Sequence, residues 1–324
     1  MSQPRKVAIL CSGGDSAGMN PALKHFTEYA RCNQIEPFGV MMGFAGLFEG
    51  KIKPMQYTDV AGIIHRGGTI LGSSRFPEFH QPEVRQEIRQ QLERHEIESL
   101  VVLGGNGSFK GMELLSKEHG IPVVGIPATI DNDVKGSENA LGVDTALNVI
   151  RHCLDQIRDT AASFHRAFIV ETMGRNCGYL AMVTALTSGA EICIVPEVGY
   201  DYESIEQRLH GQIDAGRSYL TAIVSEAIHD GSVQLKKMIT ERLGMSCRTT
   251  VLGHIQRGGS PTVADRLAAF ESVTVAVDAM QSGQENFVVL YRNGQWAPIP
   301  VDEVEPVVIS TPESLKTMTY RLAN

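Results

Sequence analysis

Short runs of apolar, mostly β-branched residues recur along the chain, and each is followed by a glycine-rich or polar turn and then by a helical pattern. We predict buried strands at residues 7–10, 100–103, 123–126, 168–170 and 222–224. Residues 83–96, 144–159 and 178–186 have the pattern of helices. Strands that alternate with such helices indicate an α/β fold with mainly parallel sheets covered on both faces.

The unusual residues of the chain lie where these predicted strands end. They form turns at residues 12–15, 104–108, 129–133, 173–175 and 225–226. Ligands of open parallel sheets bind beyond the carboxyl ends of the strands. The sequence therefore predicts a binding site at these turns.

Two of the turns are rich in glycine. Residues 12–15 precede a helix that we expect to begin near Met19, and residues 104–108 precede one expected to begin near Phe109. Glycines let backbone N–H groups approach an anion, and a helix N-terminus adds partial positive charge. Neither turn has the Gly-Lys-Ser/Thr ending of a Walker A motif. Each turn alone is equally consistent with a tight connection that binds nothing, but two in one domain favour an anion site.

A third turn carries two carboxylates, Asp131 and Asp133, on either side of Asn132. In an extended segment the two aspartate side chains point to the same side. One carboxylate can then act as a base toward a hydroxyl while the other helps to hold Mg²⁺. The alternative is a solvated turn, which is the usual role of an Asp-Asn-Asp sequence.

Several basic residues lie beside glycine turns or at the ends of predicted strands. They are Arg166, Arg175, Arg248, His254 and Arg257. The planar guanidinium group suits bidentate binding of phosphate, so these residues favour a phosphorylated small substrate. The alternative is ordinary surface ion pairs, and sequence spacing does not show that the five side chains converge.

The composition narrows the classes of protein. The 324 residues are 43% hydrophobic and 20% charged, as in an ordinary globular protein, and the length suggests two lobes. The net charge of −8 argues against a nucleic-acid or membrane-surface partner. The sequence has no run of about 18 apolar residues and no secretory signal pattern, and its six cysteines are scattered. We expect free thiols and a cytoplasmic protein.

Together these segments resemble the ATP-dependent 6-phosphofructokinase family of bacterial length. The matching stretches are residues 12–15 with 18–20, 66–69 with 71–79, 129–133, 173–175 and 251–261. The resemblance implies two similar three-layer lobes with Rossmann-like sheets and an active site in the cleft between them. It assigns residues 1–142 and 256–306 to a nucleotide-binding lobe, and residues 143–255 and 307–324 to a sugar-phosphate-binding lobe.

The resemblance also implies the reaction and the roles of individual residues. The γ-phosphoryl group of ATP would move to the 1-hydroxyl of fructose 6-phosphate, with Asp131 as the base and Thr129 beside it. The other implied catalytic residues are Gly13, Arg75 and Arg175. Residues implied around the nucleotide are Gly13, Arg75, Phe76, Arg85, Gly105, Asn106, Gly107, Ser108 and Gly111.

The implied sugar-phosphate site has two parts. The sugar-binding set is Met173, Gly174, Arg175 and Glu226, and the 6-phosphate set is Arg166, Arg248, His254 and Arg257. In the family Arg166 and Arg248 reach into a neighbouring subunit's site, which implies an oligomer, usually a tetramer. Mg²⁺ would lie near Asp133 and Asn106.

The chain departs from the family's pattern at several positions. Asn106 replaces an aspartate associated with Mg²⁺, and Phe44 replaces a tyrosine near the phosphates. Gly107 matches users of ATP, whereas Ala128 matches neither ATP users nor pyrophosphate users. The alternatives that stay open are pyrophosphate as donor, another anionic ketose as acceptor, and a weakly catalytic paralogue that binds sugar phosphate.

The effector pocket of the regulated bacterial enzymes is also altered. Arg158, Glu191 and Arg217 match that pocket, and Lys24 is a conservative change. Four positions that are expected to be basic hold Glu28, Tyr57, Ala215 and Tyr219. We therefore expect both activation by ADP and inhibition by phosphoenolpyruvate to be weak or absent.

Overall fold

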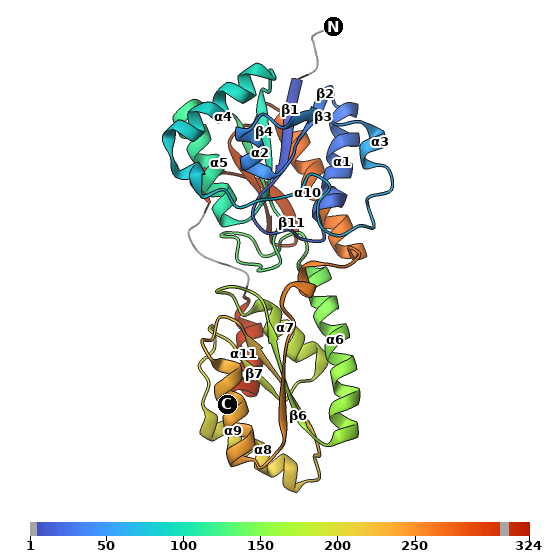
Figure 1. Cartoon of the computed structure of the whole chain (residues 1–324), viewed down its shortest axis with the longest axis vertical. Coiled ribbons are helices and arrows are strands. Elements are labelled where there is room, and N and C mark those ends of the chain that lie inside the picture. The colour runs from blue at the N-terminus through green and yellow to red at the C-terminus, as the bar shows by residue number, and fades with distance from the viewer. Residues whose placement is uncertain (1–4, 305–310) are drawn as a thin grey trace. The chain divides into compact units, whose positions relative to one another are not determined.

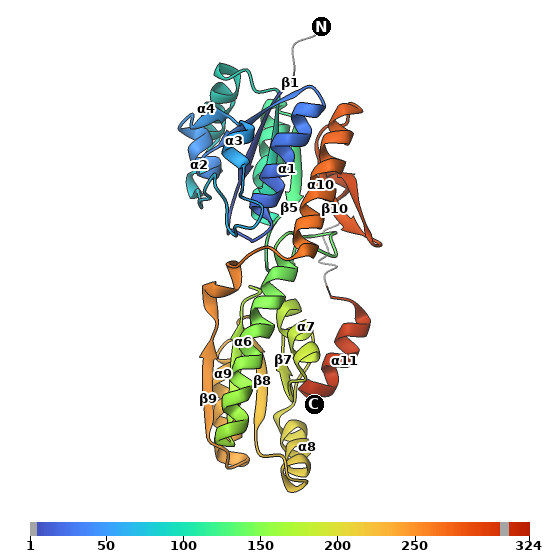
Figure 2. The same cartoon turned by 90° about the vertical axis from the view of Figure 1, so that its right-hand side faces the viewer.

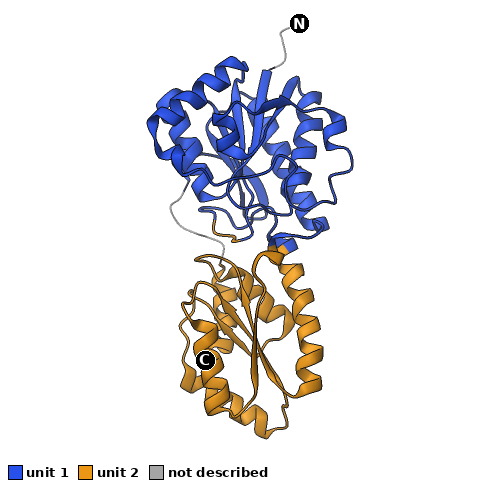
Figure 3. Ribbon diagram, in the orientation of Figure 1, with its two compact units in different colours: residues 1–130, 134–145, 257–309 blue, residues 131–133, 146–256, 310–324 orange. Residues whose placement is uncertain are grey.

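The computed structural model of the chain describes residues 5–304 and 311–324. Its contacts divide it into two compact units, shown in blue and orange in Figure 3. Unit 1 comprises residues 1–130, 134–145 and 257–309, and unit 2 comprises residues 131–133, 146–256 and 310–324. The chain leaves unit 1 after residue 145 and returns after residue 256, near the predicted crossings at 142 and 255. The third predicted crossing, near residue 306, lies outside the described residues.

Unit 1 contains a seven-stranded sheet in the order β11-β10-β5-β4-β1-β2-β3. Its strands are β1 (Arg5–Cys11), β2 (Ile35–Val40), β3 (Ile52–Pro54), β4 (Ser99–Gly104), β5 (Val123–Pro127), β10 (Phe287–Arg292) and β11 (Gln295–Pro300). The five inner strands are parallel, and β3 and β11 are antiparallel edge strands. The predicted fold class, α/β with mainly parallel sheets, is confirmed (Figure 1).

Helices cover both faces of this sheet. They are α1 (Met19–Cys32), α2 (Gly43–Phe48), α3 (Tyr57–Val60), α4 (Pro82–Arg94), α5 (Asn106–His119) and α10 (Val263–Gln281), with the 3₁₀ turns η1 (Pro77–His80) and η3 (Val301–Glu303). The apolar residues of β1 alternate between the two layers: Val7 and Ile9 pack against α1 and α10, and Leu10 packs with α2, α4 and α5. Figure 2 shows α1 beside α10, where the His25 and Phe270 rings stack with centroids 4.2 Å apart.

Unit 2 contains a four-stranded parallel sheet in the order β7-β8-β6-β9. Its strands are β6 (Ala167–Thr172), β7 (Ile192–Ile194), β8 (Leu220–Ser225) and β9 (Cys247–Val251). The helices are α6 (Val143–Phe164), α7 (Tyr179–Ser188), α8 (Tyr202–Asp214), α9 (Gly231–Arg242) and α11 (Glu313–Ala323), with the 3₁₀ turn η2 (Gly253–Arg257). Apolar residues of α8 and α9 pack on one face of the sheet, among them Leu209 and Met238. No helix in the described part of the chain has the length and apolar character needed to span a bilayer.

Asp265 joins the start of α6 to the start of α10 within unit 1. Its carboxylate is buried and accepts hydrogen bonds from the Gly142 N–H at 2.8 Å, the Thr145 N–H at 2.7 Å and the Thr145 hydroxyl at 2.5 Å. Thr262 caps α10 by accepting from the Asp265 N–H, and its hydroxyl donates to Asp144. Two backbone donors at the start of α6 are therefore satisfied by one buried side chain.

Replacing Asp265 with alanine is expected to lower the free energy of unfolding of unit 1 by about 2–4 kcal/mol, since it leaves buried backbone donors without acceptors. Urea unfolding followed by the fluorescence of Trp296 measures this, because the single tryptophan lies in β11 of the same unit. Glu93→Ala, on α4 of the same unit, is the control, because its exposed pair with Arg89 contributes little. A loss for Asp265→Ala no larger than for Glu93→Ala would contradict the prediction.

Candidate functional site

Three of the predicted turns follow three neighbouring strands of the unit 1 sheet. Strands β5, β4 and β1 are adjacent and parallel, so the segments at residues 128–130, 104–108 and 12–15 begin at the same edge. The order of the strands reverses between β4 and β1, which is where such sheets bind ligands. The turns at residues 12–15 and 104–108 touch there. The Ser12 N–H donates to the Leu103 carbonyl at 2.9 Å, and the Ser108 hydroxyl donates to the Ser12 hydroxyl at 2.9 Å.

The turn after β1 borders a hollow of about 460 Å³. Its lining is Gly13, Gly14, Asp15, Gly67, Gly68, Thr69, Gly72 and Ser73. Gly13 adopts a φ of 87°, which favours glycine, and its carbonyl accepts a hydrogen bond from the Ser73 hydroxyl at 2.7 Å. The hollow is lined largely by backbone, as expected for a site that binds an anion through N–H groups.

Asn20 holds the far wall of this hollow in place. The buried side chain donates to the carbonyls of Arg66 and Gly67 at 3.0 and 3.1 Å and accepts from the Ile70 N–H at 2.8 Å. The sequence showed Asn20 only as part of a matching stretch and gave no sign of this role. Asn20 is the second residue of α1, so its hydrogen bonds tie residues 66–70 to the helix that follows the turn at residues 12–15.

The turn after β4 leads directly into α5, which begins at Asn106, three residues earlier than expected. Ser108 is buried, and a Cβ atom at Gly104 would lie 2.6 Å from its hydroxyl and 2.9 Å from the Ser12 carbonyl oxygen, so there is no room for a side chain at residue 104. The Asn106 side-chain oxygen accepts a hydrogen bond from the Lys135 N–H at 3.1 Å. Gly105 and Gly107 flank Asn106 at the helix N-terminus, where partial positive charge favours phosphate.

The other residues predicted around the nucleotide lie just before η1, in α4 and in α5. Arg75 is exposed and Phe76 is half-buried, and the Phe76 ring lies 5.7 Å from that of Phe48. Phe44 is buried with its ring 4.6 Å from the Phe79 ring, and both residues belong to the apolar layer on this face of the sheet. A Cβ atom at Gly111 would lie 3.2 Å from the Phe79 ring, which explains the need for a small residue there.

Arg85 is committed to contacts within the protein. Only 5% of it is exposed, and its guanidinium donates to both Glu118 carboxylate oxygens, at 2.6 and 2.8 Å, and to the Phe79 carbonyl at 2.8 Å. The pair holds the pKa of Glu118 below its usual value. Arg85 therefore joins α4 to α5 and η1. Glu118, which sequence reasoning missed, is a charged helix residue with no distinguishing motif.

Cys11 ends β1 directly beside the first turn, but burial raises the pKa of its thiol to about 12. The Thr69 hydroxyl donates to its sulfur at 3.1 Å. The thiol thus stays protonated at physiological pH and is not a nucleophile.

The carboxylate turn differs from the predicted geometry. Asn132 adopts a φ of 49°, in the left-handed region that asparagine tolerates, so residues 131–133 are not extended. The premise that this segment is extended is therefore wrong, and the argument from two-residue spacing does not apply to Asp131 and Asp133. The three residues group with unit 2, although the domain prediction placed them with the first lobe, while Thr129 belongs to unit 1. Asp131 is 7% exposed.

In unit 2 the predicted sugar-binding residues come together at the carboxyl ends of β6 and β8. The Glu226 Oε1 atom accepts from the N–H groups of Gly174 and Arg175 at 3.1 and 2.8 Å, which fixes the turn after β6. Arg175 has a φ of 55° and Gly174 one of 142°, so the turn is strained and needs such support. Gly174, Arg175 and Glu226, which were predicted to bind the sugar, thus lie together in one hydrogen-bonded turn.

Gln256 supports the same turn and was missed. It is 1% exposed, accepts from the Met173 N–H at 3.1 Å, and donates to the Gly253 carbonyl at 3.0 Å. Its only signal in the sequence is its place in the matching stretch at residues 251–261, between His254 and Arg257. A buried amide that binds two backbone groups links the segment of His254 to the turn of Met173.

The four residues predicted to hold the 6-phosphate do not lie together as the sugar-binding residues do. Arg166 lies at the amino end of β6 with its guanidinium carbon 4.9 Å from the centroid of the Phe164 ring, and Arg248 is exposed on β9. His254 is exposed in η2 of unit 2. Arg257 belongs to unit 1, where its Nη1 atom lies 3.9 Å from the Asp15 carboxylate.

Arg166 and Arg248 lie at the opposite end of the unit 2 sheet from the sugar-binding residues. Strands β6 and β9 are parallel, with Phe168 opposite Arg248, so both arginines are near the amino ends. Gly174 and Glu226 follow the carboxyl ends of β6 and β8. The six residues of β6 span roughly 20 Å at about 3.3 Å per residue. A single sugar phosphate does not bridge the two ends within one chain.

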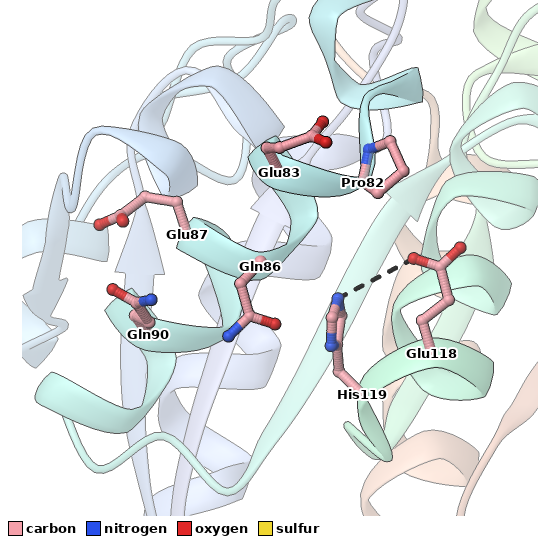
Figure 4. A pocket seen from close by; sticks show the side chains of 7 residues that line it. All are labelled: Pro82, Glu83, Gln86, Glu87, Gln90, Glu118 and His119. Carbon is pink, nitrogen blue, oxygen red and sulfur yellow. Dashed lines mark ion pairs between the residues drawn. The ribbon is translucent and has the colours of Figure 1, made fainter.

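A second hollow, of about 390 Å³, lies between α4 and the end of α5 (Figure 4). Its lining is Pro82, Glu83, Gln86, Glu87, Gln90, Glu118 and His119. The three glutamates oppose an anionic ligand, and His119 lies 3.9 Å from the Glu118 carboxylate. Among the described residues no group of three or more His, Cys, Asp or Glu side chains is arranged to hold a metal ion. The hollow beside Gly13 is therefore the better phosphate site.

Comparisons with known proteins point to one family. A sequence profile of the family described as Phosphofructokinase matches residues 6–280. The ATP-dependent 6-phosphofructokinase of Sulfurimonas denitrificans is 50% identical over 93% of this chain and 94% of its own, and that of Thermotoga neapolitana is 40% identical over 99% of both. A solved phosphofructokinase of Saccharomyces cerevisiae superposes with a TM-score of 0.89 at 29% identity over 98% of this chain, which spans 48% of the yeast chain.

Proposed function

Because the chain belongs to the phosphofructokinase family, we propose that it transfers the γ-phosphoryl group of ATP to the 1-hydroxyl of fructose 6-phosphate, giving fructose 1,6-bisphosphate and ADP, in the cytoplasm. The observation that carries the proposal is the position of two glycine-rich turns and the carboxylate segment after three adjacent parallel strands. That arrangement supplies backbone donors for phosphates, with a carboxylate a few residues along the chain.

The residues divide the work of phosphoryl transfer, in which positioning and charge neutralisation matter more than a strong base. Asp131, with Thr129 beside it, accepts the proton of the 1-hydroxyl as the oxygen attacks. Gly13 and Arg75 contact the transferring phosphoryl group, and Gly105 to Ser108 bind the nucleotide phosphates at the α5 N-terminus. Phe76 and Gly111 border the nucleotide, and Arg85 with Glu118 holds their segments together.

The sugar phosphate is held by the second set. Met173, Gly174, Arg175 and Glu226 bind the sugar. One Glu226 oxygen fixes the backbone of the turn, which leaves the other for a hydroxyl. His254 and Arg257 bind the 6-phosphate together with Arg166 and Arg248 of a neighbouring subunit, in a homo-oligomer that we propose is a tetramer. The separation of Arg166 and Arg248 from Glu226 within one chain supports a shared site.

A coupled assay with ATP, Mg²⁺ and fructose 6-phosphate tests the proposal. We expect turnover with ATP and much less with pyrophosphate, because Gly107 leaves open space beside the α5 N-terminus where an aspartate would repel a nucleotide phosphate. A panel of anionic ketoses tests the acceptor. Turnover with pyrophosphate but not with ATP would reassign the donor, and no turnover with any pair would favour a paralogue that only binds sugar phosphate.

Asp133 and Asn106 would hold Mg²⁺, which shields the charge of the ATP phosphates. Their side-chain oxygens are the hard ligands that this ion prefers, and Mg²⁺ bound with a nucleotide needs only one or two from the protein. The Asn106 oxygen lies in the first turn of α5 and already accepts the Lys135 N–H, so the amide is fixed in orientation. The residues fit the ion, but with one negative charge fewer than an aspartate gives.

Replacing Asn106 with aspartate is expected to raise the apparent affinity for Mg²⁺ several-fold and to raise kcat, because a full charge is added to a site for a hard cation. Activity titrated with Mg²⁺ at fixed ATP measures the effect. Asn293→Asp adds the same charge in the β10–β11 turn and serves as the control. Unchanged Mg²⁺ affinity and unchanged kcat in Asn106→Asp would show that Asn106 is not near the ion.

Regulation by ADP and phosphoenolpyruvate is expected to be weak or absent. Lys24 pairs with Glu28, Arg217 pairs with Glu191, and Arg158 donates to the Ser188 carbonyl. These three basic side chains thus already have acceptors within the chain, and Glu28 repels phosphate. Velocity measured against fructose 6-phosphate is expected to be hyperbolic and to change little with millimolar ADP. A sigmoidal curve that ADP makes hyperbolic would refute this expectation.

A further inference from the structure

The guanidinium group of Arg257 occupies the space where a side chain on Gly14 would lie. A Cβ atom built at Gly14 would be 1.8 Å from Arg257 Nη1 and 2.8 Å from Arg257 Cζ. Both residues belong to unit 1, although they are more than two hundred positions apart in sequence. The family-matching stretches at residues 12–15 and 251–261 therefore meet at this contact.

The backbone of the turn does not by itself require glycine at residue 14. Gly13 needs glycine because its φ is 87°, whereas Gly14 is not among the residues with positive φ. Residue 14 has to be glycine because any side chain there would clash with the Arg257 guanidinium. Gly13 and Gly14, although adjacent, are thus glycines for different physical reasons.

Other contacts fix the segment of Arg257 but leave its guanidinium weakly held. A Cβ atom at Gly67 would lie 2.4 Å from the Gly259 carbonyl oxygen, so the backbone after Arg257 packs directly on the wall of the hollow. The Asp15 carboxylate is 3.9 Å from Arg257 Nη1 and 48% exposed, and an ion pair of this length and exposure contributes little. The Arg257 Nε atom is buried without a hydrogen-bond partner in the described residues. The guanidinium thus lacks its full set of acceptors among the described residues.

We propose that Gly14 is a positioning residue for the sugar-phosphate site: it provides the space that seats Arg257 with its guanidinium directed at the 6-phosphate. The inference rests on the proposed function, in which Arg257 binds that phosphate. It assigns the second glycine of the turn to recognition of the acceptor substrate, while Gly13 acts on the transferring phosphoryl group.

The Gly14→Ala substitution tests this. The atoms in its way are the mobile end of one long side chain, so the alanine displaces Arg257 and leaves the fold intact. We expect the KM for fructose 6-phosphate to rise roughly 10- to 100-fold, the scale of one lost charge-assisted hydrogen bond or two, with the KM for ATP unchanged. Gly211→Ala, on α8 with open space around it, is the matched control and is expected to retain wild-type constants.

A double-mutant cycle separates an effect through Arg257 from a direct one. Arg257→Ala is expected to raise the same KM, and the double variant Gly14→Ala/Arg257→Ala is expected to be no worse than Arg257→Ala alone. An increase in the KM for ATP in Gly14→Ala, or additive losses in the double variant, would overturn the inference. So would a wild-type KM for fructose 6-phosphate in Gly14→Ala.

Thermal stabilisation by fructose 6-phosphate gives a readout that does not depend on turnover. Stabilisation of the wild type that is lost in both Gly14→Ala and Arg257→Ala supports the inference, and stabilisation kept in Gly14→Ala overturns it. A wild type that is inactive with ATP in the coupled assay would count against the proposed function and not against the seating of Arg257. The two failures are therefore distinguishable.

Discussion

Asp131→Asn is expected to lower kcat by about 10²–10⁴-fold, the contribution of a positioned base, while the KM values change little. The amide keeps the size of the side chain and its ability to accept hydrogen bonds, but it does not take the proton of the sugar hydroxyl. Because Asp131 is buried, a larger or shorter replacement would also disturb the turn, and asparagine isolates the chemistry.

Steady-state kinetics and the thermal shift with fructose 6-phosphate measure this prediction. Asp155→Asn, in an exposed pair with Arg151 on α6, is the control and is expected to behave as wild type. A variant that binds the sugar phosphate and turns over at the wild-type rate would remove Asp131 from the mechanism.

Arg248→Ala is expected to raise the KM for fructose 6-phosphate by roughly 10- to 100-fold and, when mixed with Asp131→Asn, to regain activity. If the arginines at the amino ends of β6 and β9 serve a neighbouring subunit, a mixed oligomer contains sites with Asp131 from one variant and Arg248 from the other. Neither homo-oligomer contains such a site at low substrate concentration.

Refolding the two variants together, followed by assay below the KM, tests this. The control mixture pairs Asp131→Asn with Glu226→Ala, two residues expected to serve the same site from one chain, and it should stay inactive. Recovery in both mixtures, or in neither, would refute a site shared through Arg248. The test uses the intact protein and needs no knowledge of the number of subunits.

Much of the fold followed from apolar runs. All five predicted strands lie within β1, β4, β5, β6 and β8, because a run that is buried on both faces is apolar at every position. Strand β2 was missed, since Pro37 and Gly39 interrupt its pattern. Strand β9 was missed because it is an edge strand with exposed positions such as Arg248 and Thr249.

The site was predicted less completely because its geometry depends on backbone turns. Turn residues at strand ends were recognised from their composition, but the argument from spacing assumed an extended backbone, and Asn132 is in the left-handed conformation. Buried supports such as Gln256 and Asn20 act through contacts with backbone groups distant in sequence. No local pattern in the sequence reports such contacts, and only the packed structure shows them.

The course of the chain through the two units has a consequence for synthesis on the ribosome. Strand β10, which pairs with β5, and helix α10, which covers α1, are translated after the whole of residues 146–256. The nascent N-terminal portion therefore waits with one sheet edge open and apolar residues such as Phe26 lacking their full cover, while the sheet of the later unit is already complete. The sheet of unit 2 is thus completed before the sheet of unit 1, the reverse of the usual N-terminal-first order, although unit 2 itself is finished only when α11 has been translated.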